Sequence, residues 1–273
     1  MHAKQYKLLS LLFILLFSAC QDMHQKKKSG EAIYRCKNET YFTLENPQSR
    51  PLPVYSWDHR FAGKYPRITK EFFRCKGNPL NPIREWKREG KETLYYRDCY
   101  GKGGHGLPLR EGKEFIYPCL VEILNYIQEK TGHRVVITTG HRCQEHNLYC
   151  DPTPSNWGSK HLLGAECDFF VETMETNPQE IVDLIISYYQ QVPPFKGDTE
   201  YEIFKRYYRE GLNVAHPPWY NKEIFIKLYQ EGEGRDLDNQ HSHPYIGIQL
   251  RMDRETGRPV VFNEKEAQKF RRY

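Results

Sequence analysis

The sequence contains two stretches whose side chains could bind one metal ion together. The first, SKHLLGAECD (159–168), offers His161 and Asp168, and the second offers His241 and His243. Two imidazoles and a carboxylate form a ligand set that zinc takes in catalytic sites, where a fourth position stays open for water. Bound zinc lowers the pKa of that water toward about 7 and polarises a carbonyl group. The pattern therefore favours metal-assisted hydrolysis of an amide bond.

Strand alternation predicts which side chains share the face of the metal. If Asp168 lies in a strand and faces the ion, then Glu166 and Phe170 share its face, while Cys167 and Phe169 point to the other side. Cys167 is therefore a poor ligand candidate.

His241 and His243 are two residues apart, so in a strand they project on the same face. We expect one of them to bind the ion and the other to reach the bound water or the substrate. In the alternative, both bind the ion together with His161 and Asp168, which would give a closed structural site.

The order of these motifs resembles a known family of bacterial cell-wall enzymes. Ser159-x-His161-x-x-Gly164 through Asp168, followed by the His-x-His motif, is similar to the zinc D-alanyl-D-alanine carboxypeptidase family of peptidoglycan metallopeptidases (the hedgehog/D-Ala-D-Ala peptidase fold group). That family's pattern is S-x-H-x-x-G-x-A-x-D. TTGHRCQEHN (138–147) is similar to the family's strand and its SGYR-x-x-x-x-N segment, so the resemblance covers roughly residues 113–273.

The resemblance implies a role for each site residue. His161, Asp168 and His243 would be the Zn²⁺ ligands, and His241 would be the catalytic side chain near the scissile bond. Arg142 would be the cation that faces a substrate carboxylate or the developing oxyanion, a role that suits the fork of the guanidinium group. The alternative for Arg142 is a surface position or a structural salt bridge.

Two further residues accompany this set. We expect Ser159 to hydrogen-bond the backbone or to orient a ligand, and not to act as a nucleophile. Glu166 stands where the family has Ala. It could be a second general base, a contact to a substrate amine, or a carboxylate paired with Arg or Lys in the wall of the site.

These roles predict an enzyme that hydrolyses peptidoglycan stem peptides as a D,D-carboxypeptidase or endopeptidase. The alternative is a non-catalytic module that keeps zinc for stability and binds cell wall or a protein. His241 and Arg142 argue against the module because a structural site requires neither, whereas Glu166 and Gln240 argue mildly for it. The sequence does not separate D,D from L,D specificity.

Helices and strands alternate around these residues. Apolar spacing predicts a helix that begins near 113 and is closed by Gly132, and short apolar runs predict buried strands over 134–140 and 165–171. Asn177-Pro178 predicts the start of a helix that runs to 191.

The C-terminal part predicts one or two further helices over 198–230, two strands joined by a turn over 241–262, and a short final helix capped by Asn263. The expected fold class is α+β, an antiparallel sheet with helices packed on it and an open zinc site.

The N-terminus predicts export. Residues 8–19 form an apolar run behind Lys4 and Lys7, too short to span a bilayer but typical of a secretory signal. Phe17-Ser18-Ala19-Cys20 resembles the lipobox of bacterial lipoproteins, which implies lipidation at Cys20. The alternative is an ordinary signal or a short membrane anchor.

The N-terminal signal and the extent of the family resemblance divide the chain into four parts. They are a lipoprotein signal peptide (1–19), a flexible tether (20–33), an accessory N-terminal segment (34–112) and a zinc peptidase domain (113–273). The expected location is the bacterial cell envelope, with a lipid anchor in a membrane and the protein facing the periplasm. The expected partners are that membrane and the peptidoglycan peptide.

Charge and cysteine content limit the other partners and predict cross-links. The formal net charge is +5, from 40 Lys and Arg against 35 Asp and Glu, which is too mild and dispersed to predict nucleic-acid binding. Eight cysteines in an exported chain predict disulfides.

We expect a Cys143–Cys150 bridge, an unpaired Cys167, and two further bridges among Cys36, Cys75, Cys99 and Cys119 that would tie an irregular N-terminal segment. A cysteine-based zinc site is the less favoured alternative because the chain has no C-x-x-C.

Overall fold

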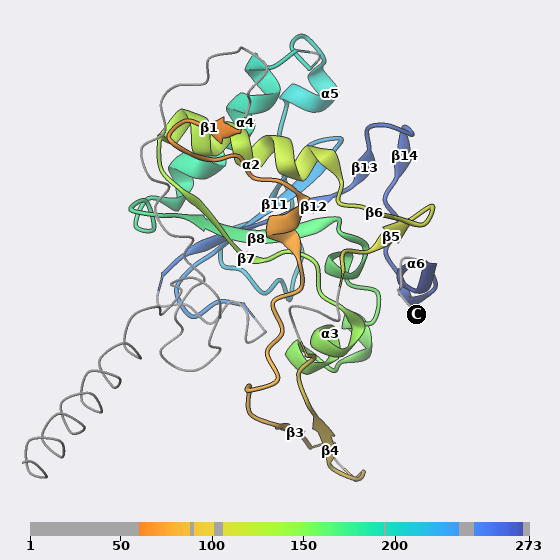
Figure 1. Ribbon diagram of the computed structural model, residues 1–273. Coiled ribbons are helices and arrows are strands. Elements are labelled where there is room, and N and C mark those ends of the chain that lie inside the picture. The colour runs from red at the N-terminus through yellow and green to blue at the C-terminus, as the bar shows by residue number, and fades with distance from the viewer. Residues whose placement is uncertain (1–59, 88–89, 101–105, 194, 235–242, 270–273) are drawn as a thin grey trace, which may run out of the picture.

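A six-stranded antiparallel sheet runs through the computed structural model, which describes residues 60–87, 90–100, 106–193, 195–234 and 243–269 (Figure 1). The strand order is β7-β8-β12-β11-β10-β9. The bounds are β7 Val135–Thr139, β8 Glu166–Val171, β9 Lys205–Arg206, β10 Trp219–Tyr220, β11 Ile224–Tyr229 and β12 Tyr245–Leu250. The predicted α+β class with an antiparallel sheet is confirmed.

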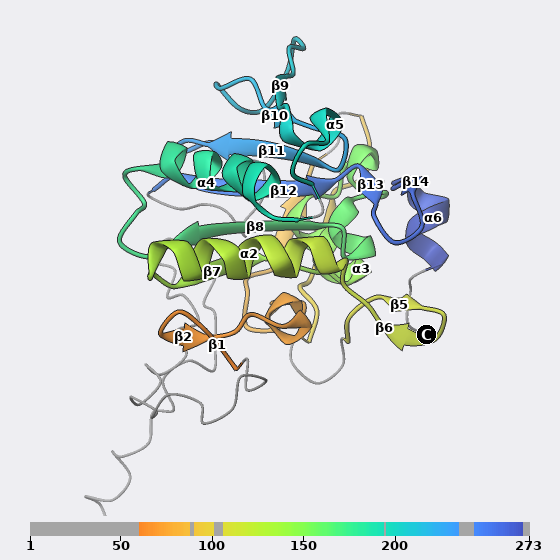
Figure 2. The same cartoon turned by 90° about the horizontal axis from the view of Figure 1, so that it is seen from above.

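Two long helices cover one face of the sheet. Helix α2 (Pro118–Thr131) contacts β7 and β8, and α4 (Pro178–Gln191) contacts β11 and β12 (Figure 2). Helix α2 ends where the sequence predicts, because Gly132 takes the left-handed conformation (φ 64°) and its N–H donates to Gln128. Helix α4 begins with Pro178 in its first turn, as expected.

The main hydrophobic core lies between these helices and the sheet. The side chains of Cys167 and Phe169 on β8 enter it, whereas Phe170 belongs to a second cluster with Tyr229 and Tyr245. The predicted alternation along β8 is therefore confirmed.

The described part of the segment before residue 113 consists of a 3-10 helix (Lys70–Phe73) and short strands. The strands are β1 Phe61–Ala62, β2 Tyr65–Pro66, β3 Arg84–Trp86, β4 Leu94–Tyr96 and β5 Leu109–Arg110. β5 pairs with β6 (Lys113–Glu114), which begins at residue 113 itself. Ile68, Phe73 and Leu107 from this segment are buried in the same core as α2 and α4. The domain boundary at 113 stays a prediction.

The prediction of a disulfide-tied segment is wrong for the described residues. None of the six cysteines there forms a disulfide: Cys75, Cys99, Cys119, Cys143, Cys150 and Cys167. The predicted Cys143–Cys150 bridge is not formed because α3 (Gln144–Cys150) begins directly after Cys143 and ends at Cys150. The seven residues of this helix separate the two cysteines by a rise of about 10 Å along its axis. Cys36 lies outside the described residues.

The prediction of one or two helices over 198–230 is also largely wrong. Only α5 (Thr199–Glu202) is helical in the described part of this region. The remainder forms β9, β10 and β11, and β11 shows the alternating burial of a strand at Ile224, Ile226 and Leu228. This period of two residues is typical of a strand and not of a helix.

The C-terminal elements match the sequence more closely. β12 is a strand, and a separate hairpin of β13 (Met252–Asp253) and β14 (Arg258–Pro259) follows it. Helix α6 (Glu264–Lys269) is capped as predicted, since the Asn263 side chain accepts a hydrogen bond from the Glu266 N–H at 2.8 Å.

Candidate metal centre

His161 lies in a 3-10 helix (Lys160–Leu163) that leads into β8. The Ser159 side chain caps this helix and accepts a hydrogen bond from the His161 N–H at 3.4 Å. Gly164 ends the helix with φ 69°, where an added Cβ would lie 2.8 Å from Ile116. This glycine allows the sharp change of direction that separates His161 from the strand bearing Asp168.

The imidazole of His161 is fixed through its Nδ1 atom. Nδ1 lies 2.8 Å from the carbonyl oxygen of Gly140, at the end of β7. A carbonyl oxygen can only accept, so Nδ1 donates and carries the proton. This is the contact that orients metal-binding histidines in general, and it leaves Nε2 to face the site.

Two carboxylates on β8 face that second nitrogen. Glu166 Oε2 lies 3.5 Å and Asp168 Oδ2 lies 3.6 Å from His161 Nε2. The three groups are buried, and one ligand atom from each lies within 4.8 Å of the other two. Glu166 and Asp168 are neighbours because they share one face of β8, opposite the face that enters the main core.

The electrostatics of this trio favour a cation. Burial lowers the pKa of His161, but the neighbouring charge of Glu166 and the contact with Asp168 raise it overall. Burial raises the pKa of Glu166, but His161, Lys227 and a hydrogen bond from Gln249 lower it overall. Two buried carboxylates around one imidazole nitrogen thus require a positive charge between them. A proton on Nε2 supplies it, and so would a divalent ion. The donor set, one nitrogen and two carboxylate groups, fits zinc.

Strand β12 borders the two carboxylates, and β7 holds the backbone of β8 at Asp168. Gln249, opposite Glu166 in β12, donates to Glu166 Oε1. Gly247 is opposite Asp168, and a Cβ there would lie 2.7 Å from Asp168 Oδ1. Thr138, at an irregularity in β7, donates through Oγ1 to the Asp168 carbonyl at 3.1 Å.

These supporting residues were missed by sequence reasoning. The signal that could have found Gly247 is a glycine inside an otherwise β-branched and aliphatic strand, which marks a close approach. Gln249 and Thr138 depend on strand register, which the sequence does not reveal.

Arg142 is buried beside His161. Its backbone N–H donates to the His161 carbonyl at 3.4 Å, its side chain is 2% exposed, and its charge lowers the pKa of His161. The neighbouring His141 has its Nδ1 2.9 Å from the same carbonyl. Burial lowers the pKa of His141 to about 4, so this imidazole is neutral at physiological pH. Arg142 is therefore a buried basic residue beside His161, and its surroundings are not those of a surface residue.

His243 is placed next to the trio but outside it. Its ring packs on Phe170 with a centroid distance of 4.5 Å, and its Nδ1 lies 3.0 Å from the Pro244 carbonyl. Phe170 shares the face of Glu166 and Asp168, so His243 lies on the metal-facing side of the sheet. His241 and Cys20 lie outside the described residues.

The trio gathered in the structure is thus His161, Glu166 and Asp168, whereas the resemblance implies His161, Asp168 and His243. The difference concerns the third ligand.

Comparison of the chain with protein-family models, with curated proteins and with solved structures finds no match. Within the described residues, no helix combines the length and the apolar character that crossing a membrane requires.

Proposed function

We propose that the chain is a zinc-dependent peptidase that cleaves stem peptides of bacterial peptidoglycan and is held at the cell envelope by a lipid on Cys20. The observation that supports it best is the arrangement of His161, whose ring is fixed at Nδ1 while Nε2 faces two buried carboxylates. The two carboxylates bring negative charge that a divalent ion would balance.

Asp168 and His161 are the first two proposed ligands, and His243 is the third. The position of His243 supports this role, because its ring packs on Phe170. Phe170 lies two residues after Asp168 in β8, so the two side chains share one face of the strand. When bound, zinc would lower the pKa of a water molecule and polarise the scissile carbonyl.

The chain's own residues supply the remaining parts. Arg142 holds a fixed positive charge in a buried position next to His161, where it would stabilise negative charge on a substrate oxygen. Glu166 is kept ionised and accepts a hydrogen bond from Gln249, which suits a proton acceptor or a contact to a substrate amine. His241 is proposed as the proton-transferring side chain.

A second candidate is a non-catalytic zinc module that binds cell wall or a protein. The position of Glu166 favours it, because a carboxylate that joins His161 and Asp168 as a further ligand would help to close the site.

One experiment separates the two candidates. The full chain is incubated with muropeptides of defined stem peptides, with and without a chelator, and with zinc restored, and the products are identified by mass spectrometry. The peptidase predicts cleavage that the chelator abolishes and zinc restores. Zinc-loaded protein that leaves every muropeptide intact would overturn the peptidase and support the module.

A further inference from the structure

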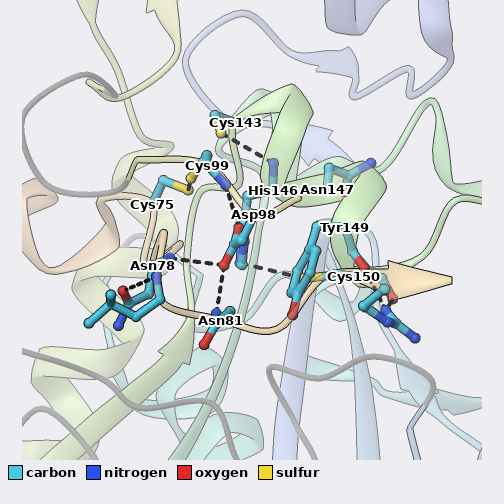
Figure 3. A network of polar contacts seen from close by, with 12 residues as sticks. Cys75, Asn78, Asn81, Asp98, Cys99, Cys143, His146, Asn147, Tyr149 and Cys150 are labelled. Carbon is cyan, nitrogen blue, oxygen red and sulfur yellow. Dashed lines mark hydrogen bonds and ion pairs between the residues drawn. The ribbon is translucent and has the colours of Figure 1, made fainter. Parts of the chain in front are cut away.

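A second group of potential metal ligands consists of three cysteines and a histidine that come together (Figure 3). Cys75 follows the 3-10 helix Lys70–Phe73, and Cys99 follows β4. Cys143 caps the N-terminus of α3, and His146 lies in the first turn of that helix. The group therefore joins two loops of the N-terminal segment to the helix that follows Arg142.

The separation of the sulfurs is that of metal ligands. Cys75 Sγ and Cys99 Sγ are 3.7 Å apart, whereas a disulfide requires about 2.05 Å. Two thiolates bound to one tetrahedral zinc at about 2.3 Å each are separated by about 3.8 Å. Cys143 is within hydrogen-bond reach of both sulfurs, which completes a triangle of three.

His146 adds a nitrogen to the triangle. One of its ring nitrogens lies within 4.8 Å of both Cys75 Sγ and Cys99 Sγ. Asp98 holds the ring in this position, with Oδ1 2.5 Å from His146 Nδ1.

Asp98 is itself held by three groups, the Cys99 N–H at 2.7 Å, the Asn78 N–H at 2.9 Å and the Asn81 side chain at 2.7 Å. A buried carboxylate that anchors a histidine is the usual outer support of a metal ligand.

The backbone around the sulfurs supports negative charge on them. The His146 N–H donates to Cys143 Sγ at 3.4 Å. Gly77 allows the chain to pass against Cys99, since a Cβ there would overlap Cys99 Sγ and lie 3.2 Å from His146 Nδ1.

A divalent cation at this position would bind the three sulfurs as thiolates, and their protons would be released to solvent.

A different arrangement of the same residues is less consistent with the burial. Cys150 Sγ lies 3.5 Å from His146 Nε2, so thiol, imidazole and the Asp98 carboxylate follow one another as in a nucleophilic triad. Cys150 and His146 are each 1% exposed, which closes this thiol to a substrate.

We propose that Cys75, Cys99, Cys143 and His146 form a structural zinc site that fixes the N-terminal segment to α3 and thereby holds Arg142 in place. Three thiolates and one imidazole are a common closed ligand set for structural zinc. The connection to Arg142 is short, because Cys143 follows it directly and the His141 N–H donates to the Phe73 carbonyl at 2.6 Å. This inference does not rest on the proposed peptidase function.

The test uses the full chain loaded with Zn²⁺ or Co²⁺ and purified with and without reductant. We expect at least one metal ion per chain and a zinc X-ray absorption spectrum that contains a shell of three sulfurs at about 2.3 Å. Co²⁺ should give an intense thiolate-to-cobalt charge-transfer band in the near ultraviolet, which a site of nitrogen and oxygen ligands does not give.

Variants assign the band to these residues. Cys75→Ser and Cys143→Ser should each abolish it, and Gly77→Ala should abolish or strongly reduce it although every ligand is retained. Cys119→Ser is the control matched to Cys75→Ser, because Cys119 is buried like Cys75 but contacts Tyr189 in the main core. His161→Ala should leave the band intact, so failure of the peptidase site and failure of this site are distinguishable.

Two results would overturn the inference without the need for any variant to fold. One is a zinc shell of the wild-type chain with nitrogen and oxygen ligands only. The other concerns protein purified without reductant. If its intact mass is lower than that of the reduced chain by two hydrogens for each pair of these cysteines, the cysteines form disulfides and are not metal ligands.

Discussion

At the scale of single residues, the orientation of His161 determines what the proposed peptidase site can do. Its Nδ1 is engaged by the Gly140 carbonyl, so only Nε2 can reach a metal ion or a proton between Glu166 and Asp168. Few contacts decide this geometry, and each can be changed separately.

Gly247→Ala should weaken zinc binding without removing a ligand. The added methyl group would lie 2.7 Å from Asp168 Oδ1 and displace the carboxylate. Changes to such supporting positions cost about 10–100-fold in metal affinity, which competition with a fluorescent zinc chelator would measure. Unchanged affinity in a folded variant would show that Asp168 does not bind the ion.

The identity of the third ligand can be decided by a pair of variants. If His243 is the ligand, His243→Ala should lose zinc from this site, whereas Glu166→Gln should retain it and lose activity. Metal analysis of the two purified proteins provides the measurement. The reverse pattern would place Glu166 in the coordination shell and favour the non-catalytic module.

Arg142→Met should leave the zinc content of the proposed peptidase site unchanged and lower the rate of muropeptide cleavage about 10²–10³-fold, the usual effect of removing one group that stabilises an oxyanion. Circular dichroism would check the fold, because Arg142 is buried. Turnover equal to that of the wild type would exclude Arg142 from the mechanism.

At the scale of elements, buried charge also joins α4, β11 and the β13–β14 hairpin. Glu223, just before β11, is fully buried and accepts two hydrogen bonds from Arg254 at 2.8 and 2.9 Å. The Tyr189 hydroxyl on α4 donates to the same carboxylate at 2.8 Å.

Arg254→Met should therefore destabilise the protein by about 3–5 kcal/mol, because it leaves the Glu223 carboxylate buried without its cation. The double variant Arg254→Met with Glu223→Gln should recover a large part of this loss. Urea unfolding followed by tryptophan fluorescence gives the three free energies. A loss below about 1 kcal/mol in the single variant would refute the structural role of the pair.

The sequence predicts elements where one pattern is strong and local. The apolar spacing of α2 and its terminal Gly132 give both the helix and its end, and alternation in β8 separates Asp168 from Cys167 correctly. The 198–230 region is different, because its strands are short and two of them have only two residues. These strands are defined by long-range pairing, β10 with β11 and β9 with β10, which no local pattern encodes.

At the scale of the whole molecule, the segment before residue 113 and the sheet domain share one core. Ile68, Phe73 and Leu107 pack with α2 and α4, and Cys75 and Cys99 meet α3. The sequence could not show this, because long-range contacts between an irregular segment and a helix have no periodic signal. Eight cysteines in a chain with an export signal predict disulfides, whereas spacing alone does not reveal which sulfurs lie beside a histidine.

The measurement that tests the central claim most directly is the zinc content of the full chain with Asp168→Asn, beside the matched buried variant Asp253→Asn. The substitution keeps the size of the side chain and removes the charge that holds the ion. We predict that Asp168→Asn lowers zinc by about one ion per chain and abolishes muropeptide cleavage, whereas Asp253→Asn retains both. Zinc content and cleavage equal to the wild type in Asp168→Asn would contradict the proposed metal centre.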